Sequence, residues 1–162
     1  MKIKQHVLSM VVFVLASGVA ASSAAQVTLE NSIRKVLTEV NPQGEVQREL
    51  VAAESVVPGD ELQYIIQFKN EGELPVDAGT IVITNMIPEH TEYLKGTAFG
   101  SGTQIKYSID GEAFAAPQDL KVADADSERP ADPTDYAAIR WNFAPVLEPG
   151  ASGYVSFNVR LK

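Results

Sequence analysis

Five carboxylates in one segment have the spacing that comes nearest to a metal site in this sequence. They occupy the first, third, fifth, ninth and twelfth positions of a calcium-binding loop. These residues are Asp124, Asp126, Glu128, Asp132 and Asp135. Arg129, however, stands where such a loop needs a glycine for its sharp turn, and Asp135 replaces the longer bidentate glutamate. A solvated acidic loop is therefore the favoured interpretation, and a calcium site is the alternative.

The remaining residues that could do chemistry are few. His90 lies in a turn-like stretch after an apolar run, and no Gly-x-Ser-x-Gly motif is present to supply the nucleophile of a catalytic triad. No second histidine follows to complete a zinc site. The chain has no cysteine, which excludes disulfides, thiolate metal sites and thiol nucleophiles. We therefore predict a non-enzymatic protein with no catalytic residues and no bound cofactor other than the calcium alternative.

The first 25 residues have the three regions of a secretory signal peptide. Lys2 and Lys4 precede an apolar run over residues 7–19, and small residues fill positions 20–25. A membrane anchor is the competing interpretation, but this run is shorter than the roughly 20 apolar residues that cross a bilayer. We expect cleavage after Ala25, with Ala24 as the alternative, and a product without a membrane span.

The predicted mature chain is strongly acidic. Without Lys2 and Lys4 it has 11 basic residues against 21 acidic ones, a net charge of −10, because no acidic residue precedes Glu30. Such a charge repels phosphate backbones, so nucleic acid is not an expected partner. Solubility is the favoured reason for the charge, and an acidic binding surface is the alternative.

The clearest structural pattern lies between two turns, over residues 57–72. Leu62, Tyr64, Ile66 and Phe68 alternate with mostly polar residues, as on a strand with one buried face. Similar reasoning predicts further strands and an Asp-Gly hairpin turn at residues 110–111. The predicted strands cover residues 27–40, 45–57, 80–85, 91–99, 104–109, 139–143 and 154–161.

These strands predict one all-β domain over residues 26–162. Seven to nine antiparallel strands spaced by turn signals are typical of an immunoglobulin-like β-sandwich, with a closed barrel as the alternative. A short helix over residues 31–37 is the alternative to the first strand. Residues 117–135 lack periodicity and predict an exposed loop between strands.

The aromatic residues bear on carbohydrate binding, which needs rings displayed on one exposed face. Most of them share register with aliphatic residues and are expected in the core. These core candidates are Tyr64, Phe68, Trp141, Phe143 and Phe157. Tyr93, Tyr136 and Tyr154 are left as candidate outward rings, so a carbohydrate-binding β-sandwich is an alternative function.

The first predicted strand offers a third kind of function. Residues 26–40 can pair within their own sheet or add to the exposed edge of a neighbouring protein, as donor strands do. Ordinary pairing within the chain is the favoured interpretation.

Residues 50–162 resemble the conserved-repeat domain of bacterial envelope proteins catalogued as domain of unknown function 11. The resemblance rests on Val57-Pro58-Gly59-Asp60, on Asn70-Glu71-Gly72, on the β-branched run ending at Pro88, and on Leu147-Glu148-Pro149-Gly150 before the last strand. Asn85 stands where the family usually has aspartate, and only one copy is present. The single copy argues against the spacer role of long tandem arrays.

The resemblance implies an immunoglobulin-like module of an exported or surface protein. We therefore expect a structural or protein-interaction module of the bacterial cell envelope, in the periplasm or at the cell surface. A protein partner in the envelope is expected, without a signal for its identity.

Overall fold

The computed structural model describes residues 26–124 and 127–162, with the backbone alone at Asp124. The predicted signal peptide and Asp126 lie outside the described residues. The regular structure of the described chain is strand, apart from two short 3-10 helices, η1 (Pro117–Asp119) and η2 (Pro133–Asp135). The strands are β1 (Val27–Val40), β2 (Val46–Ala52), β3 (Glu61–Asn70), β4 (Ile81–Met86), β5 (Thr91–Tyr93), β6 (Phe99–Gly100), β7 (Thr103–Ser108), β8 (Lys121–Asp124), β9 (Ser127–Pro130), β10 (Ala138–Phe143) and β11 (Ser152–Leu161).

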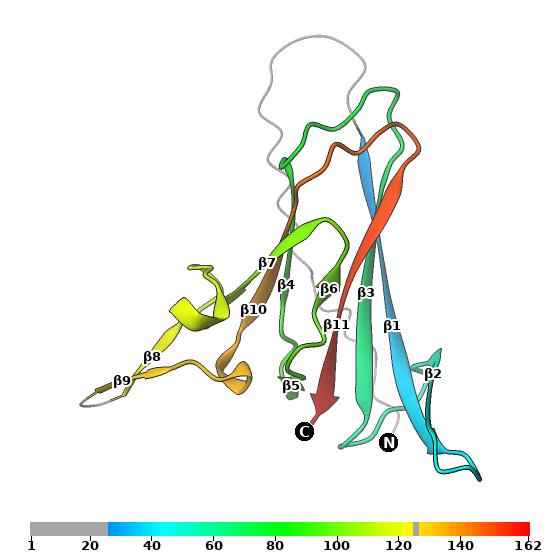
Figure 1. Cartoon of the computed structure of the whole chain (residues 1–162), viewed down its shortest axis with the longest axis vertical. Helices are drawn as coiled ribbons and strands as arrows, with labels where there is room; N and C mark the ends of the chain where they lie inside the picture. The colour runs from blue at the N-terminus through cyan, green and yellow to red at the C-terminus, as the bar shows by residue number, and fades with distance from the viewer. Residues whose placement is uncertain (1–25, 125–126) are drawn as a thin grey trace.

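The strands form antiparallel sheets of unequal width (Figure 1). The larger sheet has the order β2-β1-β3-β11-β5, and β6 pairs with β11 beside β5. The smaller sheet has the order β4-β10-β7, and β8 and β9 form a separate hairpin. Neither order closes into a ring, so the barrel alternative is wrong. No helix within residues 26–124 and 127–162 has the length and apolar character to cross a bilayer.

The alternating patterns predict correctly which side chains are buried. Leu62, Ile66 and Phe68 of β3 are buried, whereas Gln67 and Lys69 are exposed. The last strand departs from this pattern, because Ser156 and Asn158 are buried as well as the apolar residues between them. These two residues lie on β11 between β3 and the β5–β6 segment, whose Thr97 hydroxyl accepts a hydrogen bond from the Asn158 amide at 3.0 Å.

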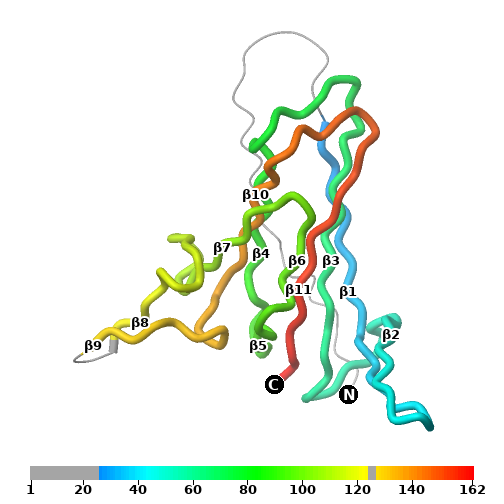
Figure 2. Tube along the Cα trace, in the orientation of Figure 1, coloured from blue at the N-terminus to red at the C-terminus, as the bar shows by residue number. Residues whose placement is uncertain are grey.

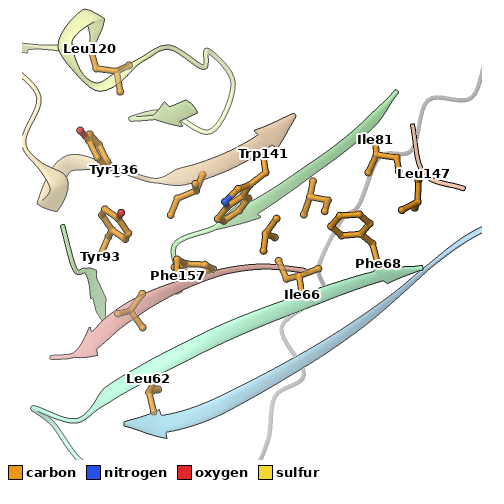
Figure 3. Packing of buried hydrophobic residues seen from close by; sticks show 14 residues of the cluster. Leu62, Ile66, Phe68, Ile81, Tyr93, Leu120, Tyr136, Trp141, Leu147 and Phe157 are labelled. Carbon is orange, nitrogen blue, oxygen red and sulfur yellow. The ribbon is translucent and has the colours of Figure 1, made fainter. Parts of the chain in front are cut away.

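The core lies between the larger and the smaller sheet (Figure 3). Trp141 of β10 is fully buried, with its ring centroid 5.9 Å from that of Phe157 on β11. Phe68 meets Phe143 edge-on at 5.1 Å. A Cβ at Gly153 would overlap the Phe68 ring, so β11 needs a glycine directly opposite Phe68. The Trp141 Nε1 has no acceptor among the described residues, so buried area rather than hydrogen bonding holds this ring.

The described chain has more strands than the seven to nine expected, for two reasons. The expected strand over residues 91–99 is two short strands, β5 and β6, which both pair with β11. The segment 117–135, predicted as a loop, contains the β8–β9 hairpin, in which Lys121 lies opposite Pro130. Backbone pairing rather than a buried face stabilises this hairpin, so its sequence has no apolar alternation to reveal it.

The first strand is confirmed, and the helix alternative over residues 31–37 is wrong. β1 pairs with β3 from Val27 to Val36 and with β2 from Arg34 to Val40. The turn after it is closed by Asn41, whose side-chain oxygen accepts hydrogen bonds from the backbone amides of Gln43 and Glu45. Residues 26–40 therefore find their partners within the chain.

A buried asparagine joins two loops at one end of the sheets, at the top of Figure 1. Asn70, fully buried, donates from Nδ2 to the carbonyls of Leu74 and Leu147 at 2.7 and 3.0 Å. Its Oδ1 accepts from the Gly72 amide at 3.0 Å. Val76 and Leu147 also bond to each other through two backbone hydrogen bonds. The side chain of Asn70 thus ties the β3–β4 loop to the β10–β11 loop.

Asn70→Ala should lower the free energy of unfolding by about 2–3 kcal/mol, because it removes three side-chain hydrogen bonds and leaves space in a buried position. Urea unfolding followed by the fluorescence of Trp141, the only tryptophan, measures this. Asn31→Ala is the matched control: Asn31 is exposed, so its loss should change stability by less than about 0.5 kcal/mol. Equal effects of the two substitutions would show that the buried amide does not join the loops.

Candidate functional site

His90 lies in the turn before β5 and is exposed. It is the one non-glycine residue with positive φ, 61°, among the described residues, and its carbonyl accepts a hydrogen bond from the Lys162 amide. Within residues 26–124 and 127–162, no group of three metal-ligating side chains comes together. The structure therefore gives His90 a place in a turn and brings no catalytic partner to it.

The acidic segment is divided between a hairpin and a 3-10 helix, rather than wrapped around one point. Glu128, on β9, forms an exposed ion pair with Lys121 at 3.1 Å. Asp132 precedes η2, and Asp135 ends it. Asp124 has no described side chain, and Asp126 lies outside the described residues. Of the five carboxylates in the calcium hypothesis, the structure thus shows three, each in a different local setting.

Asp135 is held by a cation of its own chain. Its two carboxylate oxygens accept hydrogen bonds from both terminal nitrogens of Arg129, at 2.6 and 2.8 Å, and one of them also accepts from the Asp132 amide. The Arg129 hydrogen bonds, with the backbone bond adding, lower the pKa of Asp135 from 3.8 to about 2. Arg129, which occupies the glycine position of a calcium loop, thus neutralises the carboxylate at its twelfth position.

A second carboxylate with a low pKa closes the Asp-Gly turn after β7. The backbone amide of Glu112, the hydroxyl of Ser108 and the amide of Ala113 all donate to Asp110, which lowers its pKa to about 2. The turn returns the chain to β7, where Tyr107 and Ala115 form two backbone hydrogen bonds. The predicted hairpin turn is confirmed, although the segment after the turn pairs with β7 only at Ala115.

Two of the three candidate outward rings are in fact buried. Tyr93 lies opposite Val159 of β11 and is 3% exposed, and Tyr136 is 8% exposed. Tyr136 stacks on Tyr107 at 4.6 Å between ring centroids, and the hydroxyls of Tyr93 and Tyr107 lie 3.2 Å apart. The rings of these tyrosines pack together, and the hydroxyls of Tyr93 and Tyr107 bond to each other, so a polar hydroxyl did not require exposure here.

Burial raises the pKa of three of the tyrosines. Desolvation raises the pKa of Tyr107, and its hydrogen bond with Tyr93 raises it further. Desolvation likewise raises the pKa of Tyr136 and of Tyr64. None of the three is prepared as a phenolate nucleophile. Tyr154 remains exposed, with its ring centroid 5.5 Å from that of Phe99, so the carbohydrate hypothesis retains one of its three rings.

The most distinctive surface is the β1–β2 hairpin, residues 34–52. β3 pairs with β1 no further than Val36, so the hairpin extends past β3 and projects from the sheet (Figure 1 and Figure 2, lower right). Val40 lies directly opposite Val46, and Val36 directly opposite Leu50. Side chains directly opposite in an antiparallel pair share a face.

One face of this hairpin carries two aliphatic pairs, separated by the polar pair Thr38 and Arg48. Val40 is 67% exposed, Val46 63% and Leu50 47%, whereas Val36 at their base is buried. We call these four residues the hairpin face. β2 is also the edge of the larger sheet, so its outer backbone groups have no strand partner among the described residues. Aliphatic side chains beside an open strand edge are features of a protein-binding surface.

A polar network anchors the hairpin to the body of the sheet. Arg48 lies on β2 between Val46 and Leu50. It forms an ion pair with Glu61 at the start of β3. Glu61 also accepts a hydrogen bond from Asn158 of β11, and the Asn158 oxygen accepts from Gln63 at 3.1 Å. The network crosses four neighbouring strands and fixes the base from which the hairpin projects.

Sequence reasoning treated Val46 and Leu50 as anchors of an extended segment and did not recognise the hairpin face. The turn Asn41-Pro42-Gln43-Gly44 was the available signal. A hairpin folded about that turn pairs Val40 with Val46 and Val36 with Leu50, which places all four side chains on one face. The segment's few apolar residues could then have been read as one surface.

Comparison of this chain with protein-family models, with curated proteins and with solved structures found no match. The residues available for a functional proposal are accordingly those of the hairpin face and its open strand edge.

Acid should weaken the fold between about pH 4 and pH 2. Asp135 and Asp110 have folded pKa values below the ordinary 3.8, so their stabilising effect is present above pH 4 and is lost as they protonate toward pH 2. Asp135→Asn should lower the thermal midpoint at pH 7 and flatten its dependence on pH in this window. Asp77→Asn, in an exposed loop, is the control and should follow the unsubstituted protein. A steep acid transition retained in Asp135→Asn would assign the acid sensitivity to other groups.

Calcium should produce no heat of binding at millimolar concentration, the range of weak extracellular sites. The reason is that the Asp135 carboxylate already forms an ion pair with Arg129, and the Glu128 carboxylate already forms one with Lys121. Isothermal titration of the purified protein measures this directly. Heat that disappears in Asp135→Asn would instead establish the calcium site.

Proposed function

We propose that this chain is an exported, immunoglobulin-like β-sandwich that serves as a non-enzymatic protein-interaction module of a bacterial cell envelope. Two antiparallel sheets that share one core support the sandwich. The pattern of residues 1–25 supports export. The resemblance of residues 50–162 to domain of unknown function 11 supports a place in the envelope.

The observation that carries the interaction role is the hairpin face. Three aliphatic side chains, Val40, Val46 and Leu50, are about half or more exposed on an element that projects from the fold. Exposed apolar residues are common singly, but three on one face of a projecting element favour a partner that covers them. The network from Arg48 to Asn158 holds the hairpin in place before a partner arrives, which reduces the entropy cost of binding.

A protein partner suits this surface better than a carbohydrate. Sugars bind by stacking on aromatic rings, and the hairpin face has aliphatic side chains instead. The free edge of β2 can bond to an added strand of another protein, while the neighbouring valines contact its side chains. The hairpin thus provides backbone hydrogen bonds and apolar contacts at the same place.

A photo-cross-linking residue at Val46 should give a discrete protein adduct in cells that export this chain, because Val46 lies at the centre of the proposed contact. The same residue at Asp77, in the β3–β4 loop at the other end of the sheet, should give none. Electrophoresis and mass spectrometry of the exported fraction measure the adduct.

The adduct at Val46 should disappear when Leu50→Glu is added, because a charge opposes apolar contact. Leu50 is 47% exposed, so this change should alter stability by less than about 0.5 kcal/mol, which urea unfolding checks. Adducts from both positions alike, or an adduct that survives Leu50→Glu, would contradict the proposed role of the hairpin face.

A further inference from the structure

The outer face of the smaller sheet has a row of polar side chains on three adjacent strands. Thr84 of β4, Arg140 of β10 and Lys106 of β7 lie directly opposite one another. The next row, centred on Trp141, faces the core. Because successive residues of a strand point to opposite faces, the row with Arg140 points away from the core. This is a different sheet from the one that forms the β1–β2 hairpin.

Two cations therefore lie side by side without a carboxylate. Like charges directly opposite each other in a sheet repel. Within residues 26–124 and 127–162, neither Arg140 nor Lys106 forms an ion pair, although Lys35, Lys69, Lys121 and Arg129 do. The chain has 21 acidic residues against 13 basic ones, so acidic groups are abundant elsewhere. Its own carboxylates leave this pair of cations unneutralised.

The guanidinium of Arg140 is held in a fixed orientation. Its Nε donates to the Thr84 hydroxyl at 3.0 Å, and its Cζ lies 3.6 Å from the centroid of the Phe114 ring. The side chain is half-buried. Its two terminal nitrogens have no acceptor among the described residues. A guanidinium held on one face by an aromatic ring, with both terminal nitrogens available, is arranged to bind a carboxylate through two parallel hydrogen bonds.

We propose that Arg140 and Lys106 form a carboxylate-binding site for an acidic segment of a partner protein. Arg140 binds one carboxylate through both terminal nitrogens, and the Lys106 ammonium contacts the same group from the adjacent strand. Charge complementarity identifies the occupant, because neither cation forms an ion pair with a carboxylate of the described residues. The net charge of the chain, −8, disfavours nucleic acid, whose closely spaced phosphates it repels over a longer range.

The site goes beyond the proposed role of the hairpin face, since it uses other residues on the other sheet. Its test is fluorescence anisotropy of a labelled peptide of alternating glutamate and glycine, titrated with the purified protein at low salt. A matched peptide with glutamine in place of glutamate is the ligand control. We expect the glutamate peptide to bind, the glutamine peptide not to bind, and added salt to weaken binding.

Three variants assign the binding to these residues. Arg140→Lys retains the charge but loses the paired donors, and Lys106→Gln removes the second cation; we expect at least about tenfold and about fivefold weaker binding, respectively. Lys95→Gln, at an exposed lysine in the β5–β6 turn, removes the same charge elsewhere and should leave the affinity within about twofold. Unchanged Trp141 fluorescence verifies that each variant is folded.

The outcomes separate this proposal from the previous one. Val46→Glu should not alter peptide binding, so failure of the hairpin role leaves this site standing. No binding of the glutamate peptide, or equal loss in Lys106→Gln and Lys95→Gln, overturns the site. Binding of an acidic oligosaccharide such as a polyuronate in the absence of peptide binding overturns the assignment to a protein segment.

Discussion

The two sheets are joined at one end by the buried side-chain amide of Asn70. Asn70 satisfies two carbonyls and one backbone amide, and the carbonyl of Leu147 that it bonds is also the acceptor for Val76. The backbone of Asn70 also bonds to the β10–β11 loop, at Gly150 and Ala151. Without these bonds the buried amide of Asn70 would lose its partners beside the core. The two sheets are therefore joined by specific polar contacts at one end and by apolar packing between them.

The unequal widths of the sheets determine which surfaces remain free. The smaller sheet contributes Trp141 and Ile83 opposite β3 and β11, whereas β1 and β2 lie farther along the larger sheet. The strands nearest the core are thus packed on one face, while the end of β1 and all of β2 extend past the shared core. The functional proposals follow from this arrangement. One uses the extended hairpin, and the other uses the outer face of the narrow sheet.

Alternation in the sequence was enough to predict the all-β fold and most of the core, because Leu62, Ile66 and Phe68 need no long-range information to share a face. Tyr93 and Tyr136 could not be placed in the same way, since their burial depends on contact with Tyr107 from another strand. The β8–β9 hairpin is held by backbone pairing, which alternation does not reveal. The proximity of Arg140 and Lys106 likewise could not be predicted, because it depends on the register between two strands that are distant in sequence.

β11 comes last of the described strands along the chain, yet it lies in the interior of the larger sheet between β3 and β5. It supplies Val155, Phe157 and Val159 to the core, all of them fully buried. Contacts between β3 and β11 span most of the domain, and closing such a long loop is slow. The core therefore cannot form progressively as the chain is synthesised from its N-terminus. The domain can assemble only after β11 is available to pair with β3. Until then the apolar faces of β3 and β10 are accessible to chaperones and proteases.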